Sequence, residues 1–120
     1  MKLTVYKETE TQNLVWYKLK HDYPFPYLHL SKKFLGEKFN EYPEELSVTI
    51  GIDEDDGLEG AMSLHKYMES SKSIWYRQEV DNPPIGYFML YKEALRGEFE
   101  KYPVKILVLI NGGKNERKKN

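Results

Sequence analysis

Residues 46–52, LSVTIGI, decide the fold class, because this stretch has the pattern of a β-strand. Apolar residues alternate with small or polar ones, and a period of two places all the apolar residues on one face of a sheet. That face is expected to be buried and consists of Leu46, Val48, Ile50 and Ile52. The other clear apolar run, 104–110 (VKILVLI), is apolar on both faces, which is typical of a central strand.

Two hairpins are predicted beside these strands. The first joins 2–7 (KLTVYK) to 14–20 (LVWYKLK) through a polar connection. The second joins 74–80 (IWYRQEV) to 85–91 (IGYFMLY) through the turn-forming residues DNPP. The intervening segment HDYPFPYLHL, residues 21–30, contains two prolines, so we expect neither a helix nor a central strand to run through it.

Helices are predicted in three places. The first follows Ser31, a potential N-cap, and stops before Pro43. The second is an amphipathic stripe within 58–69, and the third covers 92–102, KEALRGEFEKY, after the last strand of the second hairpin. A continuous helix over 87–102 is the competing interpretation, because its apolar residues also fall on one helical face.

These elements predict an α+β fold in one domain. We expect a mostly antiparallel sheet of about five or six strands with two or three helices over residues 1–111, and no internal repeat. Residues 112–120 are expected to form a flexible basic C-terminal tail.

Composition narrows the function classes. The chain has no cysteine, which excludes disulfides and thiolate chemistry and favours a soluble protein of the reducing cytoplasm. No apolar run is long enough to cross a bilayer, so no membrane association is expected. The 18 basic and 19 acidic residues include four basic groups in the last seven positions, which leaves an acidic body. Nucleic-acid binding requires clustered Lys and Arg and is therefore not expected.

The acidic run at 53–56, DEDD, has three interpretations. Asp56 and Glu59 have the spacing of a capping box, so the run can begin the second helix. It can also form an acidic surface that binds a protein, or a Mg²⁺ or Ca²⁺ site that uses Asp53 with Asp55 or Asp56. The EF-hand pattern fails, and we expect no metal or other cofactor.

No catalytic constellation stands out. The serines lack the strained turn of a nucleophile, and the three histidines are scattered. His21, Asp22 and His29 lie on one proline-stiffened stretch, where a base with an orienting carboxylate or a metal site is conceivable. His65 is expected to be a packed histidine on the second helix.

The aromatic content suggests binding instead of catalysis. The chain contains ten Tyr, five Phe and two Trp, and Tyr23, Phe25 and Tyr27 fall on the proline-rich stretch, where ordering on binding costs little. We expect a small non-enzymatic module that binds another protein, in the manner of inhibitor, immunity or adaptor proteins. Its candidate surfaces are the Tyr23, Phe25 and Tyr27 stretch and the acidic edge of Asp53, Asp55 and Asp56.

Two alternative functions come from other classes. One is a metal-dependent hydrolase that combines the carboxylates of 53–56 with His21 or His29. The other is a structural subunit of a homo-oligomer, which would bury the open edge of the first hairpin or the exposed sides of Trp16 and Trp75.

Overall fold

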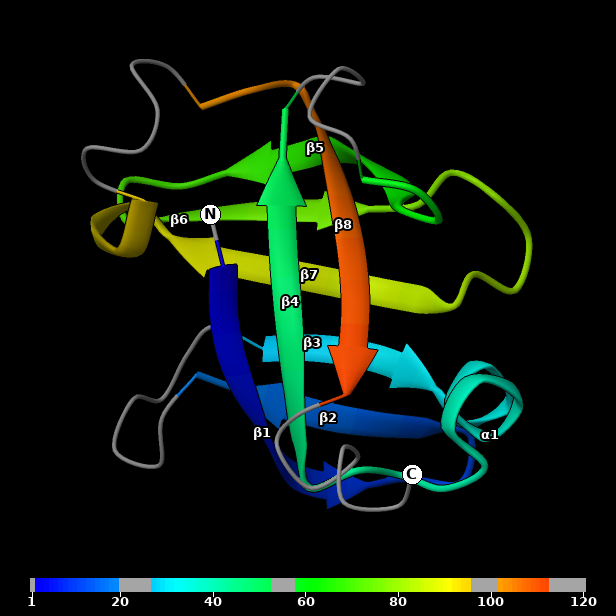
Figure 1. The fold of residues 1–120 in the computed structure, drawn as a ribbon. Helices are drawn as coiled ribbons and strands as arrows, with labels where there is room; N and C mark the ends of the chain where they lie inside the picture. Colours follow the sequence, from blue (N-terminus) through cyan, green and yellow to red (C-terminus); the bar gives the residue numbers. More distant parts are fainter. Residues whose placement is uncertain (1, 20–26, 53–57, 96–101, 113–120) are drawn as a thin grey trace.

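The strand predicted at 46–52 exists, and it closes a barrel (Figure 1). The computed structural model describes residues 2–19, 27–52, 58–95 and 102–112. The described residues form eight antiparallel strands in the order β1-β2-β3-β7-β6-β5-β8-β4. Strand β4 pairs with β8 on one side and with β1 on the other, so the sheet has no open edge.

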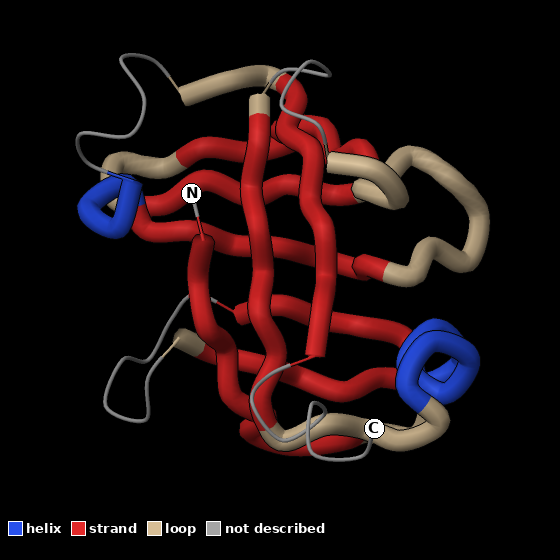
Figure 2. The backbone as a smooth tube through the Cα atoms, in the orientation of Figure 1, coloured by secondary structure: helices blue, strands red, loops and turns tan. Residues whose placement is uncertain are grey.

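The described residues are mostly strands, with few helical segments (Figure 2). In chain order the elements are β1 (Lys2–Glu10), β2 (Leu14–Lys18), β3 (Tyr27–Ser31), α1 (Lys32–Phe39), β4 (Glu45–Gly51), β5 (Met62–Glu69), β6 (Ser73–Arg77), β7 (Ile85–Tyr91), the 3₁₀ helix η2 (Lys92–Leu95) and β8 (Lys105–Gly112). Among the described residues, no helix has the length and apolar character needed to span a membrane.

The α+β prediction was wrong. The described residues hold eight strands and one short α-helix, instead of five or six strands with two or three helices. Both predicted hairpins are confirmed as β1–β2 and β6–β7, and β8 is central, as expected from its two apolar faces. Helix α1 is also confirmed, with the Ser31 side chain accepting a hydrogen bond from the backbone N–H of Phe34.

The second predicted helix is strand β5. The predicted stripe mixes residues of the preceding turn, Leu58 and Ala61, with strand residues whose alternation a β-bulge between Lys66 and Met68 interrupts, which together give helical spacing. The expected helix start is instead a turn, in which Ala61 N–H donates to Leu58 O and Gly60 adopts a φ of 80°. Of the third predicted helix, the structure describes only η2 and Tyr102; residues 96–101 lie outside the described ranges.

Two further expectations need correction. Strand β3 is bonded to β2 and β7, so a central strand does begin inside the proline-rich segment, immediately after Pro26. A proline just before the first strand residue removes no ladder hydrogen bond, which is why the strand is compatible with it. Ile52 lies beyond the end of β4 and is 54% exposed, whereas Leu46, Val48 and Ile50 are buried as predicted.

The interior of the barrel is the hydrophobic core. All eight strands contribute large apolar side chains that are 3% exposed or less, among them Val48 of β4, Phe88 of β7 and Val108 of β8. An eight-stranded barrel encloses just enough space for such side chains to fill. Any binding surface on the strands should therefore lie on the outside.

The barrel consists of two equivalent halves. Strands β1 to β4 form a Greek key in the spatial order β4-β1-β2-β3, and strands β5 to β8 form another in the order β8-β5-β6-β7. The halves meet where β3 pairs with β7 and where β4 pairs with β8. Each half has its helical segment between its third and fourth strands, and Figure 1 shows α1 and η2 at opposite ends of the barrel.

Each half contains an equivalent tyrosine–proline hydrogen bond that joins two of its own segments. The buried Tyr17 hydroxyl of β2 donates to Pro43 O at 2.7 Å, just before β4. In the second half, the buried Tyr76 hydroxyl of β6 donates to Pro103 O at 2.9 Å, just before β8. Each bond anchors the chain that enters the last strand of its half to the second strand of that half.

An ion cluster is also present twice. The Glu10 carboxylate accepts from Lys7 and Lys32, both at 3.1 Å, and the Glu69 carboxylate accepts from Lys66 at 3.0 Å and Lys92 at 2.6 Å. Hydrogen bonds from these lysines hold the pKa of each carboxyl group below its usual value of 4.5. Lys32 and Lys92 lie over the rings of Tyr42 and Tyr102, respectively, at 5.4 and 5.3 Å from the ring centroids.

The sequence carries the same repeat, so the expectation of no internal repeat was wrong. Trp16–Tyr17 recurs as Trp75–Tyr76, and residues 27–52 align with 87–112 without a gap. Residues identical in that alignment are Tyr27, Leu30, Lys32, Leu35, Phe39, Tyr42, Pro43, Val48 and Ile50. The repeat is divergent, and the shared hydrogen bonds show which of its residues build the framework.

The two tyrosine–proline bonds should contribute about equally to stability. Tyr17→Phe and Tyr76→Phe each leave a part-buried proline carbonyl without its donor, and each should lower the free energy of unfolding by about 1 kcal/mol. Tyr42→Phe, a change at a ring that is 36% exposed, should cost less than about 0.5 kcal/mol. Urea denaturation measures the free energy of unfolding of all three variants. A large cost in only one half would contradict the equivalence of the halves.

Burial of the same two tyrosines should also lower the stability of the protein in alkaline solution. Burial raises the pKa of Tyr76 to about 12 and also raises the pKa of Tyr17 above its ordinary value of 10. The unfolded chain loses these phenolic protons near pH 10 while the native barrel keeps them, so unfolding releases protons and the free energy of unfolding decreases above about pH 10. Urea denaturation between pH 9 and 11 tests this. The Tyr17→Phe, Tyr76→Phe double variant should have a shallower dependence, and an unchanged slope would contradict the assignment.

Candidate functional site

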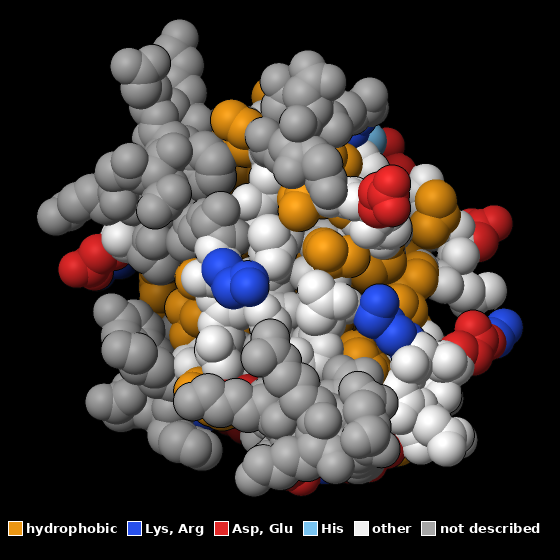
Figure 3. All heavy atoms as spheres, in the orientation of Figure 1, with side chains coloured by type: hydrophobic (Ala, Val, Ile, Leu, Met, Phe, Trp, Pro, Cys, Tyr) orange, Lys and Arg blue, Asp and Glu red, His pale blue; other side chains and the backbone are white. Residues whose placement is uncertain are grey.

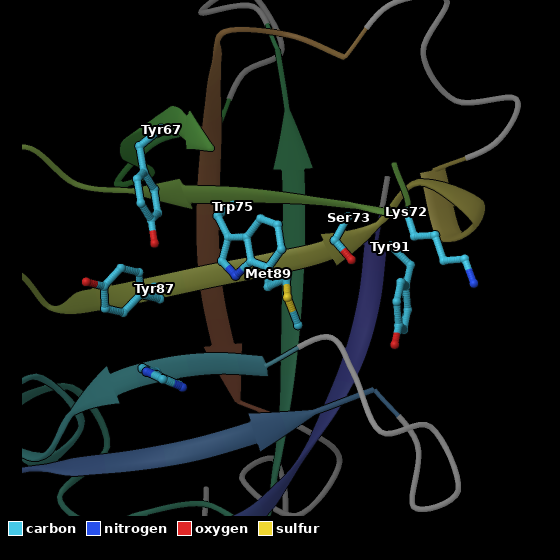
Figure 4. Close-up of a pocket in the computed structure, with 8 residues that line it drawn as sticks. Tyr67, Lys72, Ser73, Trp75, Tyr87, Met89 and Tyr91 are labelled. Atoms are coloured by element: carbon cyan, nitrogen blue, oxygen red, sulfur yellow. The ribbon is translucent and has the colours of Figure 1, made fainter. Parts of the chain in front are cut away.

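A hollow with many aromatic residues lies on the outside of the barrel (Figure 4). We call it the outer groove. It has a volume of about 480 Å³, within the range of ligand-binding pockets. It is lined by His29 of β3, Tyr67 of β5, Lys72, Ser73 and Trp75 on and beside β6, and Tyr87, Met89 and Tyr91 of β7.

Strand alternation explains why these side chains point outward. Trp75 stands between Ile74 and Tyr76, both fully buried inside the barrel, so Trp75 must project from the opposite face. Met89 stands in the same way between two buried neighbours and is the register partner of Trp75. The groove is therefore built on strands whose inner faces are locked in the core.

The groove is elongated along β6 and β7. In Figure 4, Tyr67 and Tyr87 approach each other at one end, Trp75 and Met89 occupy the middle, and Ser73, Tyr91 and Lys72 lie at the other end. Register pairing supports this order, because Ser73 faces Tyr91 and Trp75 faces Met89. Successive outward residues on a strand are about 6.8 Å apart, so Tyr91, Met89 and Tyr87 of β7 mark three evenly spaced positions along the groove.

A continuous series of ring contacts borders the groove. The His29 ring stacks on Trp16 with centroids 4.6 Å apart and meets the Tyr87 ring edge-on at 5.9 Å. Tyr87 in turn lies 5.7 Å from Tyr67, and the Arg77 guanidinium lies 4.7 Å from the Tyr67 centroid. These contacts restrict the rings, although Tyr67 and Tyr87 remain 39% and 42% exposed.

Burial lowers the pKa of His29 below its ordinary value of 6.5, which favours the neutral ring. A neutral imidazole stacked on an indole behaves as a flat, mostly apolar surface. His29 thus extends the groove toward β2 without adding charge.

The end of the groove at Lys72 and Ser73 is polar. Lys72 makes no ion pair with the part of the chain that the structure describes, and Ser73 is only 6% exposed. The Ser73 backbone bonds to Ser70, but its own hydroxyl has no hydrogen-bond partner among the described residues. A hydroxyl that lines a cavity and is not used by the fold is available to a ligand.

Comparison of the two halves indicates where the groove departs from the equivalent surface of the first half. Where β5 and β6 carry Tyr67 under Arg77, the equivalent positions of β1 and β2 carry Glu8, paired with Lys18 at 3.9 Å. Similarly, Leu14 stands at the position equivalent to Ser73. The second half has exchanged an ion pair for an aromatic contact and an apolar side chain for the hydroxyl of Ser73.

The wall formed by β1, β4 and β8 differs from the groove. On this face, apolar side chains lie among polar and backbone atoms, with isolated basic and acidic side chains (Figure 3). Outward residues of β4 include Ser47 and Thr49, which are small and polar.

Most of the predicted site residues lie outside the described ranges. These are Tyr23 and Phe25 of the aromatic stretch, Asp53, Asp55 and Asp56 of the acidic run, and His21 with Asp22. The backbone of Tyr27 is described as the first residue of β3. The two candidate surfaces therefore stay predictions.

His29 is the one proposed metal ligand in the described part of the chain. It lies on β3, three strands away from β4 around the barrel, and its ring is packed on Trp16. The described residues contain no cluster of three or more His, Asp or Glu able to hold a metal ion. His65, expected on a helix, is on β5 with its Nδ1 buried and without a hydrogen-bond partner among the described residues.

Sequence reasoning missed the outer groove because its residues are spread over four strands that are not all consecutive. The high tyrosine content predicts a binding surface, but the sequence pattern places it at the stretch around Tyr23 instead of at Trp75 and Tyr87. The useful signal was the divergent repeat. Aligning Trp16–Tyr17 with Trp75–Tyr76 would have exposed the positions at which the second half differs from the first.

No known protein family, curated protein or solved structure matches this chain.

Proposed function

We propose that the chain is a small non-enzymatic binding module for a protein partner, and that the outer groove is its binding surface. The groove combines the residue types that dominate protein interfaces, namely Trp75, the tyrosines, Met89 and, at its border, Arg77. Such side chains contribute most of the binding energy in known interfaces. The absence of cysteine supports a cytoplasmic location for this activity.

The observation that carries the proposal is the divergence of the two halves. Both halves keep the tyrosine–proline bond and the ion cluster of one glutamate with two lysines, so these features serve the barrel itself. Trp75 and Tyr87 of the groove recur as Trp16 and Tyr27, but Tyr67 and Ser73 stand where the first half has Glu8 and Leu14, and the shared framework bonds do not involve them. Exposed aromatic side chains without a structural role favour binding.

The rigidity of the outer groove further supports a binding role. Tyr67, Trp75 and Tyr87 are on strands of a closed barrel, and ring contacts already restrict Tyr67 and Tyr87. Little side-chain entropy remains to be lost when a partner covers them.

The two alternative functions have less support. No observation favours the metal-dependent hydrolase. The homo-oligomer hypothesis relied partly on an open edge of the first hairpin, but β1 is paired on both sides, with β2 and β4. A second copy of the chain covering Trp75 is the remaining form of that hypothesis, and sedimentation distinguishes it from a protein partner.

Selection of peptides tests the proposed surface. Random peptides displayed on phage are selected on the wild-type protein and then measured against Tyr87→Ala and Ser73→Leu. Tyr87→Ala removes an exposed ring, and Ser73→Leu fills one end of the groove with the residue type of the equivalent Leu14. Each variant should weaken the selected peptides by at least about tenfold, as expected for hot-spot residues.

Tyr42→Ala is the matched control, because this ring has similar exposure but lies outside the groove. It should change affinity by less than about twofold. Peptides that bind all the variants equally would place the binding surface elsewhere. Sedimentation equilibrium on the same proteins detects a dimer that Tyr87→Ala dissociates, and that result would replace the protein partner with a second copy of the chain.

A further inference from the structure

The two ends of the outer groove differ in charge. At one end, the Glu69 carboxylate pairs with Lys66 and Lys92, whereas Lys72 makes no ion pair with the described residues. At the other end, Arg77 borders a second hollow that is also lined by Glu79 and Asp81. None of the residues that line the outer groove is acidic.

Lys72 and Ser73 both line the first end of the groove. Among the described residues, the Glu69 carboxylate pairs with Lys66 and Lys92, so it does not neutralise Lys72. The Ser73 hydroxyl, on a residue that is only 6% exposed, lines the same end and is not used by the described residues. The Lys72 ammonium can pair with a carboxylate at this end, and the Ser73 hydroxyl supplies a further polar group there.

The spacing of the groove sets the pattern of side chains that a bound segment should carry beside this carboxylate. The outward residues Tyr91, Met89 and Tyr87 of β7 recur at about 6.8 Å, the distance between alternate side chains of an extended peptide. An extended segment with an acidic residue and then apolar residues at every second position matches all three positions.

We propose that the outer groove binds an extended segment of a partner protein that carries one carboxylate over Lys72 and Ser73 and aromatic or aliphatic side chains over Trp75 and Tyr87. This inference rests on the proposed function, because it specifies the partner of the same groove. The barrel has no free strand edge, so the segment lies across the outer side chains instead of adding a strand.

Two peptides that differ only in charge test the inference. The probes are Ac-Glu-Thr-Phe-Thr-Phe-NH₂ and Ac-Gln-Thr-Phe-Thr-Phe-NH₂, in which threonine favours the extended form. Binding is followed by two-dimensional amide NMR of the full chain. Both peptides should shift residues of β6 and β7, and the Glu peptide should bind about three to ten times more tightly at low salt. The ratio should decrease at about 0.5 M salt because the exposed lysine is screened.

Variants assign the preference to the proposed groups. Lys72→Gln should bring the Glu peptide to the affinity of the Gln peptide, and Ser73→Ala should reduce the ratio in part. Lys2→Gln removes an exposed lysine of β1 and should leave the ratio unchanged. Because neither the Lys72 nor the Ser73 side chain bonds within the described fold, both variants should keep the wild-type spectrum elsewhere.

Three results would overturn the inference. Equal binding of both peptides at the groove would remove the carboxylate preference and leave the proposed function in place. A preference that persists in Lys72→Gln would locate the anion site elsewhere. No shift of β6 and β7 with either peptide would contradict both this inference and the groove as the binding surface.

Discussion

Closure of the sheet by β4 is the constraint on which the rest of the structure depends. Each Greek key alone would expose two strand edges; pairing of β4 with β8 removes one edge from each half, and pairing of β3 with β7 removes the other. Closure directs one face of every strand into a core that only large apolar side chains can fill, as Val48 and Val108 do. Binding is then confined to the outer faces, and there the groove formed by β3, β5, β6 and β7 is the strongest candidate.

The internal repeat separates framework from function within a single chain. Tyr17 and Tyr76 make the same bond to a proline carbonyl, so this contact is required by the fold. Ser73 and Tyr67 have no counterpart of the same chemistry, since Leu14 and Glu8 stand in their places. A residue that departs from its structural equivalent, is not used by the fold and lines a cavity is a reasonable candidate for a binding role.

The sequence predicted the elements with regular patterns. Strand β4 follows a strict alternation, and α1 begins with a good cap at Ser31. Strand β5 was missed because its bulge leaves Tyr67 and Met68 both exposed, which imitates helical spacing. Closure could not be predicted, because pairing of β4 with β8 joins segments far apart in the chain. The groove depends on this long-range order, and its residues carry no local motif.

Native-state amide hydrogen exchange tests the closed, two-part barrel most directly. If β4 closes the barrel, its amides should exchange only through global unfolding, with a free energy equal to that from denaturation. Equivalent halves should also give similar protection for Lys7 N–H and Lys66 N–H, which donate to Glu44 O and Val104 O at equivalent points. Low protection along β4, or protection limited to one half, would contradict a barrel closed by two equivalent Greek keys.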